Sequence, residues 1–304
     1  MEIKQLEIFV CVVKNLSFSK AAAEMYISQS AVSMCISSLE KTLGVQLLVR
    51  NTKGVSPTKS GAELLIYAQK ILTLREQALH NIGGKDREAH GIIDISSSTI
   101  PAQHLLPEII AAFHKQWPNI VFRVNQADSH QVEQSMSGFR YDFGMVGTIP
   151  DDTRFIHHPV YDDELVLAIP ADAPESAETI RDNFKDYILK TPFIMRESGS
   201  GTRAEIEALL AKLGVDSDDL HISAYFSDVH SILLSVSRGL GVSLVSKIAA
   251  AMYVDAGILR TVEMNSPIFC RQIHLLYNKE LWLSPLQQAF VDHARDYYYS
   301  RTFE

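Results

Sequence analysis

Two short polar segments of the chain have the composition of a site for a small anion. Residues 97–101 (SSTIP) follow one apolar run and residues 197–203 (ESGSGTR) follow another, and each precedes a segment of helical periodicity. Backbone N–H groups at the start of a helix favour a negative charge, and hydroxyl groups add further hydrogen-bond donors. Both segments are therefore candidates for binding a carboxylate or an oxyanion.

Further small polar residues follow other apolar runs of the same region. Gly147 and Thr148 come directly after residues 143–146, and the pairs 128–129 and 227–228 open further predicted helices. The predicted effector-binding residues are Ser98, Thr99, Gly147, Thr148, Ser198, Gly199, Gly201 and Thr202. The alternative for each serine and threonine is that its hydroxyl only caps the helix that follows.

A second set of residues with recognisable chemistry lies in the first sixty positions, which contain three short helical patterns. Residues 3–13 form the first, and residues 18–25 form the second, where three consecutive alanines let another helix cross closely. After a turn at residues 26–28, Ser28 is a suitable N-cap for the third helix, which Gly44 ends. Its predicted core face consists of Val32, Ile36, Leu39 and Leu43.

The opposite face of this third helix carries small polar groups. It consists of Ser30, Ser33, Met34, Ser37 and Lys41, with Gln29 in the first turn. Small side chains let a helix enter the major groove of DNA, a glutamine amide pairs with base edges, and a methionine methyl contacts thymine. An isolated helix with such a face would more often be simply solvated, so the residues that follow it decide between the two interpretations.

Those residues predict a wing. Residues 44–50 and 51–58 have the pattern of two short strands around a basic turn, from which Arg50 and Lys53 would reach phosphates or the minor groove. The first sixty residues hold seven Lys and Arg against four Asp and Glu, a balance of +3 in a chain whose net charge is -8. A basic module on an otherwise acidic chain is typical of a DNA-binding protein.

The spacing of these residues resembles the DNA-binding domain of LysR-type transcriptional regulators. The matching residues are Leu6, Phe9, Ser17, Phe18, Ser19, Ala21, Ala22, Ser28, Gln29, Ser30, Ala31, Val32, Ser33, Ile36, Leu39, Glu40, Leu43, Gly44, Leu47, Arg50, Thr58 and Gly61. The resemblance implies a winged helix-turn-helix that binds double-stranded promoter DNA. The predicted DNA-binding residues are Ser17, Ser19, Lys20, Gln29, Ser30, Ser33, Met34, Ser37, Arg50 and Lys53.

The sequence departs from the family pattern at three places. Ser30 stands where proline is usual, Met34 and Cys35 stand where polar side chains are commoner, and Leu48 stands where phenylalanine is usual. The expected fold is unchanged by these departures. The base preferences cannot be carried over from the family, because Ser30 and Met34 lie on the predicted reading face.

A long helix is predicted from Thr58 to about Lys85, since nothing after Gly61 breaks it. Its apolar positions recur at three- and four-residue steps and are Leu64, Leu65, Ala68, Ile71, Leu72, Leu79 and Ile82. We expect a dimer seam in which Arg75 favours one register, the alternative being a stripe packed within the chain. Residues 83–86 are expected to form a hinge between two modules. The resemblance agrees, because family members dimerise through this helix and commonly form tetramers.

From Gly91 onward, predicted strands alternate with helices, which is the signature of an α/β fold with a largely parallel sheet. The predicted strands lie near residues 93–95, 120–124, 143–146, 164–169, 193–195, 222–226, 242–245 and 269–277, and a closing helix starts at Ser284. Two subdomains joined by two crossing strands would leave a cleft between them. This region resembles the family's effector-binding domain, which is built like a periplasmic solute-binding protein.

Three domains follow from these patterns, in an overall α/β fold class. They are a winged helix-turn-helix at residues 1–58, a linker and dimerisation helix at 59–88, and an effector-binding domain at 91–304. The last divides into subdomain I, about 91–163 and 268–304, and subdomain II, about 164–267. By resemblance, Ser98, Thr99 and Thr148 correspond to pocket positions of the family.

The motifs of common enzymes are absent from the sequence. It contains no GxxxxGK[ST], GxSxG or HExxH pattern, and Cys11, Cys35 and Cys270 are too far apart for a CxxC pair. His157 and His158 precede Pro159, where a loop or a strand edge is favoured over a metal site. We therefore expect no catalytic residues, no metal and no cofactor. Without a leader or a membrane-spanning segment, a cytoplasmic location is expected.

The sequence thus predicts a regulator that senses a small, anionic metabolite and alters DNA binding or bending at promoters. The resemblance of residues 97–101 and 199–203 to members linked with sulfur metabolism adds a sulfur oxyanion to the carboxylates as an expected effector. Expected partners are promoter DNA, further copies of the chain in a homodimer or homotetramer, and RNA polymerase. The alternatives are a small-molecule binding protein without regulatory DNA binding, and an α/β enzyme.

Overall fold

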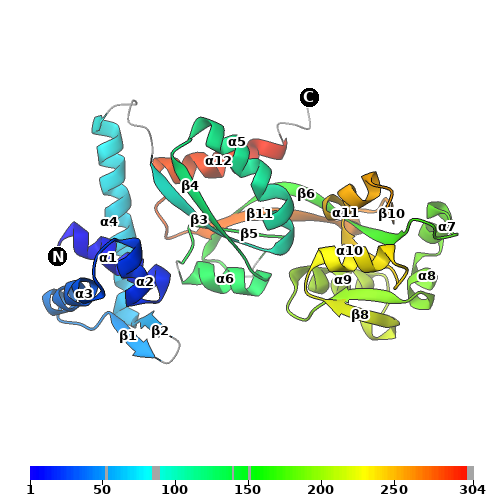
Figure 1. Ribbon diagram of the computed structural model, residues 1–304, viewed down its shortest axis with the longest axis horizontal. Coiled ribbons are helices and arrows are strands. Elements are labelled where there is room, and N and C mark those ends of the chain that lie inside the picture. The colour runs from blue at the N-terminus through cyan, green and yellow to red at the C-terminus, as the bar shows by residue number, and fades with distance from the viewer. Residues whose placement is uncertain (52–53, 84–89, 139, 150–151, 300–304) are drawn as a thin grey trace.

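The computed structural model describes residues 1–51, 54–83, 90–138, 140–149 and 152–299. Figure 1 shows a chain of modules, with a small helical head at the N-terminus, one long helix, and two α/β lobes. None of the described helices is both long and apolar enough to cross a membrane.

The head is built by three helices, α1 (Ile3–Asn15), α2 (Phe18–Glu24) and α3 (Gln29–Leu43). Its core is apolar and includes Leu6, Phe9 and Val12 of α1, together with Val32 and Leu39 of α3. The alanines of α2 allow the predicted close crossing, since Ala21 and Ala22 are buried. The prediction of the core face was wrong at Leu43, which is 38% exposed because it is the last residue of α3.

The wing consists of the antiparallel strands β1 (Leu48–Asn51) and β2 (Gly54–Pro57). β1 begins later than the predicted start at Gly44, because Gly44 ends α3, as predicted, with a φ of 71°. A carboxylate oxygen of Glu40 accepts hydrogen bonds from the backbone N–H groups of Leu47 and Leu48 at 2.8 and 3.2 Å. The wing is therefore anchored directly to the helix that precedes it.

The packing of the long helix α4 (Lys59–Gly83) differs from part of the predicted dimer seam. Leu65 and Ala68 are 2% and 0% exposed because they pack into the core of the chain's own head. Arg75, predicted to set a dimer register, forms an ion pair of 3.0 Å with Glu7 of α1. The alternative of packing within the chain thus holds for this part of α4, and Leu79, at 46% exposed, remains available to a partner.

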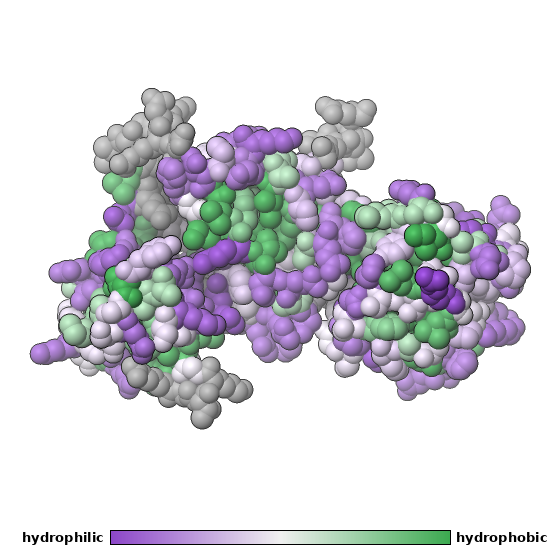
Figure 2. All heavy atoms as spheres, in the orientation of Figure 1, coloured by the Kyte–Doolittle hydropathy of each residue, from purple (hydrophilic) through white to green (hydrophobic). Residues whose placement is uncertain are grey.

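Ion pairs connect the head to the first α/β lobe. Lys14 of α1 lies 3.3 Å from Asp94 and 3.1 Å from Asp142, and both carboxylates are almost fully buried. Arg123 bridges Asp94 at 2.5 Å and Glu24 of α2 at 2.8 Å. Figure 2 shows hydrophilic side chains gathered where the head meets this lobe. The orientation of the head is therefore fixed by charge pairing as well as by α4.

The first lobe is built on the parallel strands β3 (Gly91–Ser97), β4 (Ile120–Gln126) and β5 (Phe143–Val146). Helices α5 (Leu106–Gln116) and α12 (Pro285–Tyr299) cover one face of this sheet, and α6 (Ser129–Ser137) covers the other (Figure 1). A π-helical turn, η1 (Pro101–Leu105), precedes α5. Phe113, Phe122, Phe143 and Phe290 pack together under α12.

Two long antiparallel strands, β6 (Phe155–Pro170) and β11 (Cys270–Asn278), run from this lobe into the second. There β6 pairs with β9 (Ser243–Ser246) and β10 (Leu259–Val262), both antiparallel. The expected largely parallel sheet is thus a mixed one, because a strand that leaves a lobe and a strand that returns to it run in opposite directions. His157 and His158 lie within β6, opposite Leu276 and Leu275, close to the register shift between Ile273 and His274.

Within the described residues, the second lobe is completed by a small parallel sheet and by five α-helices. The strands are β7 (Phe193–Arg196) and β8 (Ile222–Phe226). The helices are α7 (Ala177–Asp182), α8 (Phe184–Lys190), α9 (Gly201–Lys212), α10 (Val229–Ser237) and α11 (Lys247–Asp255). The start of α9 faces the first lobe, which places the polar segment at residues 197–203 at the junction between the lobes.

Candidate effector cleft and DNA-reading surface

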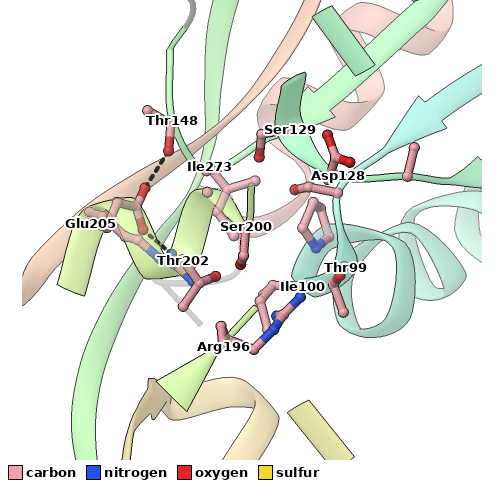
Figure 3. Close-up of a pocket in the computed structure, with 16 residues that line it drawn as sticks. Thr99, Ile100, Asp128, Ser129, Thr148, Arg196, Ser200, Thr202, Glu205 and Ile273 are labelled. Carbon is pink, nitrogen blue, oxygen red and sulfur yellow. Dashed lines mark hydrogen bonds and ion pairs between the residues drawn. The ribbon is translucent and has the colours of Figure 1, made fainter. Parts of the chain in front are cut away.

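A cavity lies between the two lobes, at the ends of strands from both (Figure 3). The first lobe contributes the loop after β3, the start of α6 and the residues after β5, while the second contributes the end of β7 and the first turn of α9. Its lining residues are Ser98, Thr99, Ile100, Pro101, Ala127, Asp128, Ser129, Gly147, Thr148, Arg196, Ser200, Gly201, Thr202, Glu205, Arg271 and Ile273.

Six of the eight predicted effector-binding residues line this cavity, and two do not. The six are Ser98, Thr99, Gly147, Thr148, Gly201 and Thr202. Ser198 and Gly199 are exposed and border a neighbouring depression at the mouth of the cleft. The backbone turns at Gly199, where φ is 91°, so that Ser200 reaches the cavity and is 6% exposed.

The cleft is nearly closed. The cavity measures about 20 Å³, which is room for about one water molecule. A β-carbon added to Gly201 would collide with the hydroxyl of Ser129, so the absence of a side chain at Gly201 lets the lobes approach this closely. A ligand larger than a water molecule can enter this inner cavity only if side chains move or the lobes separate.

Three charged residues of the cavity were missed by the sequence prediction. Arg271 of β11 is held by Asp163, whose carboxylate lies 2.8 Å from its Nε and from its Nη2, and by Glu205 of α9, which contacts its Nη1. Burial lowers the pKa of Arg271, but Glu205 and Asp163 outweigh burial and raise it above its usual value. The guanidinium is therefore a permanent cation at the junction of the lobes.

Arg196 is the second cation. Its Nε and Nη2 donate to Glu197 at 2.9 and 3.0 Å, and Nη2 also donates to the carbonyl of Ser227 at 3.1 Å. Its Nη1 has no hydrogen-bond partner among the described residues. The side chain is only 7% exposed, and it lies beside the cavity (Figure 3).

A sequence signal for these residues did exist. Arg196 ends the apolar run of residues 193–195, and Arg271 stands near the start of the apolar returning strand. A charge inside a strand that is otherwise buried requires a partner, which marks it as a member of a site. Glu205 had no comparable signal, because a glutamate in the second turn of a helix is usually exposed.

On the head, α3 presents the predicted reading face to solvent. Gln29, Ser30, Met34 and Ser37 are exposed, with Met34 at 72%, and Ser33 is half-buried. Ser28 caps the helix by accepting from the N–H of Ala31 at 3.1 Å. The helix therefore begins at Gln29, which places that residue at the exposed N-terminal end.

The remaining predicted DNA-binding residues flank α3. Ser17 caps α2 and is half-buried, whereas Ser19 and Lys20 are exposed, and the hydroxyl of Ser19 donates to Gln29 at 3.1 Å. The side chain of Arg50 and the whole of Lys53 lie outside the described residues.

Tyr26 is an exposed aromatic residue that the prediction assigned only to the turn between α2 and α3. It is 95% exposed, with a φ of 55°. Because Tyr26 lies beside the start of α3, its hydroxyl is accessible to a DNA phosphate. The positive φ at Tyr26 could not be predicted from the sequence pattern.

Comparison with known proteins agrees with this architecture. The LysR substrate binding domain model matches residues 86–298, and the model of the lysR-family bacterial regulatory helix-turn-helix protein matches residues 3–62. An HTH-type transcriptional regulator of Methanocaldococcus jannaschii is 32% identical over 278 residues, covering 91% of this chain and 93% of its own. YeiE of Escherichia coli, also described as an HTH-type transcriptional regulator, is 30% identical over 292 residues and 96% of each chain.

Solved structures share the fold over nearly the whole length. A full-length OxyR variant from Pseudomonas aeruginosa has a TM-score of 0.74 at 19% identity, covering 97% of this chain and 95% of that one. CbnR complexed with its target DNA has a TM-score of 0.55 at 20% identity, covering 97% and 99%. The effector-binding domain of QuiR, solved with shikimate, has a TM-score of 0.58 at 22% identity, covering 69% and 97%.

The matched relatives are regulators rather than enzymes. The chain belongs to the LysR family of DNA-binding transcriptional regulators, with an N-terminal helix-turn-helix and a C-terminal α/β effector-binding domain.

Proposed function

We propose that this regulator senses a small anion, a carboxylate or an oxyanion such as a sulfur oxyanion, in the cleft between its two lobes. The main support for this proposal is a set of hydrogen-bond donors that line one cavity and have no partner within the described part of the chain. The hydroxyls of Thr99, Ser200 and Thr202, and Nη1 of Arg196, have no hydrogen-bond partner among the described residues. Donors in a desolvated cavity are stabilised by an anion that accepts from them. The binding of shikimate, itself a carboxylate, by the related domain of QuiR supports this class of ligand.

The proposed DNA-reading residues are those of α3 and its surroundings. Gln29, Ser30, Ser33, Met34 and Ser37 would contact base edges in the major groove, because their side chains are small or reach outward. The proposed backbone contacts come from Ser17, Ser19, Lys20, Tyr26, Arg50 and Lys53. Chromosomal DNA as the target implies that the protein acts in the cytoplasm.

The proposed working form is a homodimer or a dimer of dimers whose heads contact neighbouring sites on a promoter. Binding of the effector would change the relation between the two lobes, and hence the spacing of the heads and the bend in the DNA. The change in bend would alter recruitment of RNA polymerase. The ion pairs between the head and the first lobe support this mechanism, because they leave little freedom of movement between the two modules. A movement of the first lobe would therefore also move the head on the DNA.

Thermal unfolding with simple anions tests the effector site. We expect acetate, phosphate or sulfate to raise the melting temperature of the wild-type protein above that in sodium chloride of equal ionic strength. Thr99→Ala should reduce this shift, because it removes a donor from the cavity. The matched control is Ser198→Ala, which lies outside the cavity and should leave the shift unchanged. An undiminished shift in Thr99→Ala would remove that residue from the site.

A further inference from the structure

The carboxylate of Glu205 already occupies the cleft as an anion would. One oxygen accepts from the hydroxyl of Thr148 at 2.8 Å, and the other contacts Nη1 of Arg271 (Figure 3). Thr148 follows β5 of the first lobe, Glu205 lies on α9 of the second, and Arg271 lies on a strand that joins them. A single carboxylate thus connects all three parts of the cleft.

Charge balance does not require Glu205 at this place. The positive charge of Arg271 is already matched by Asp163, which is 0% exposed and accepts a further hydrogen bond of 2.7 Å from Ser246. Glu205 adds a second carboxylate to the same guanidinium and remains 18% exposed. It is therefore the member of this group that has access to solvent and could leave.

The geometry around Glu205 also suits an incoming ligand. The donors that it holds border the same cavity as the unused hydroxyls of Thr99 and Thr202. The cavity has room for about one water molecule while Glu205 is in place. An anion that reached all of these donors would have to take the position of the Glu205 carboxylate.

We propose that Glu205 is a built-in competitor of the effector, occupying with its own carboxylate the position that the effector's anionic group takes. The effector binds by accepting from Thr148 and Arg271 in place of Glu205, which releases the link between α9 and the first lobe. This inference rests on the proposed function, because it assigns the step by which an anion enters that cleft. Its consequence is that the wild-type affinity is reduced by the cost of expelling Glu205.

The opposite role for Glu205 is that it pairs with a cationic group of the effector. For a probe that carries no cationic group, the competitor role predicts tighter binding when the charge of Glu205 is removed and its shape is kept, whereas the pairing role predicts no gain in affinity. Glu205→Gln makes this change. The matched control is Glu207→Gln on the same helix, since Glu207 pairs with Arg203 outside the cavity.

The experiment is a calorimetric titration of the full-length wild-type, Glu205→Gln and Glu207→Gln proteins with acetate and with sulfate, at constant ionic strength. We expect Glu205→Gln to bind one of these anions about tenfold more tightly than wild type, because a charge-assisted competitor is gone. Glu207→Gln should bind as the wild type does. Circular dichroism of each variant verifies that it is folded before titration.

Two other outcomes would overturn part or all of these proposals. If wild type binds the anion and Glu205→Gln binds it equally or more weakly, the competitor role is overturned while the effector site stands. If neither protein binds either anion, the proposed anion site fails and this inference fails with it. Binding by Glu205→Gln alone supports the competitor role in its strongest form.

Discussion

Small hydroxyl side chains and charged side chains behave differently as sequence signals in this protein. Ser98, Thr99 and Thr148 could be predicted as cavity residues, because they follow buried strands at the edge of the sheet where ligands bind and because they match pocket positions of the family. Arg196 and Arg271 interrupt apolar runs, which indicates a buried charge but not where in the fold it lies. The partners of Arg271, Asp163 and Glu205, come from segments that only the fold brings together, and the partner of Arg196 is simply the next residue, Glu197. At the residue scale, the sequence therefore predicts the donors of the cleft and misses its charge pairs.

Substitutions on α3 should separate base recognition from backbone contact. Gln29→Ala and Met34→Ala should each relax the preferred sequence at individual positions, and loss of the glutamine amide should cost about 1–3 kcal/mol of discrimination. Lys20→Ala should weaken binding to all sequences alike and reduce the salt dependence of the affinity. Selection of binding sites from random DNA, followed by titration at several salt concentrations, measures both effects. Unaltered sequence preference in both α3 variants would exclude these residues as readers.

The long helix α4 shows what periodicity does and does not indicate. Its apolar stripe correctly predicts a continuous helix, but the same stripe serves packing within the chain at Leu65 and Ala68. A heptad-like pattern does not distinguish a partner helix from a neighbouring one, because both bury the same face. The role of the stripe thus depends on where α1 packs, and no local pattern in α4 contains that information.

The ion pairs between α1 and the first lobe should contribute to stability. Burial lowers the pKa of Lys14, but Asp142 and Asp94 outweigh it and raise the pKa above its usual value. The stabilisation is therefore fully present below the unfolded pKa of about 10.4 and is lost only as pH rises through the higher folded value. Lys14→Met leaves the buried carboxylate of Asp142 without a cationic partner among the described residues, while Asp94 keeps its pair with Arg123. We therefore expect a loss of about 3 kcal/mol at neutral pH.

Thermal or urea unfolding of Lys14→Met at neutral pH measures this loss. Lys4→Met is the matched control, because Lys4 is 60% exposed in its pair with Glu7 and should contribute little. Equal stability of the two variants would show that the junction between head and lobe is not held by these charges.

The crossing strands should make the protein sensitive to mild acid. His274 lies beside the register shift in β11, is 5% exposed, and has an Nδ1 without a hydrogen-bond partner among the described residues. Burial, reinforced by His157, lowers its pKa to about 4. Because the unfolded histidine takes up a proton near pH 6.5 and the folded one does not, stability falls as pH drops from about 6.5 toward 4.

We expect this effect to reach about 2 kcal/mol at pH 5 and to disappear in His274→Phe. Melting temperatures between pH 7 and 5 measure it, with His114→Asn on the exposed surface of α5 as the control. If His274→Phe loses as much stability as wild type over this range, another group is responsible for the acid sensitivity.

At the scale of the whole molecule, the order of modules could be predicted because each has its own local signature. The helix-turn-helix, the unbroken helix and the strand–helix alternation are all visible in the sequence, and the family matches cover residues 3–62 and 86–298. The closure of the cleft and the attachment of the head to the first lobe could not be predicted. Both depend on contacts such as Gly201 against Ser129 and Lys14 against Asp94, which join distant segments.

Selection of genomic DNA fragments by the purified full-length protein, followed by footprinting with and without a cleft anion, tests whether an effector in the cleft controls DNA binding. We expect enrichment of a small set of promoter fragments, protected over neighbouring sites, with an extent of protection or a hypersensitive position that changes with the anion. Gln29→Ala should reduce the enrichment. Retention of no genomic fragment above background at low salt, or footprints unaffected by any anion that binds the cleft, would contradict the account of an effector-controlled DNA reader.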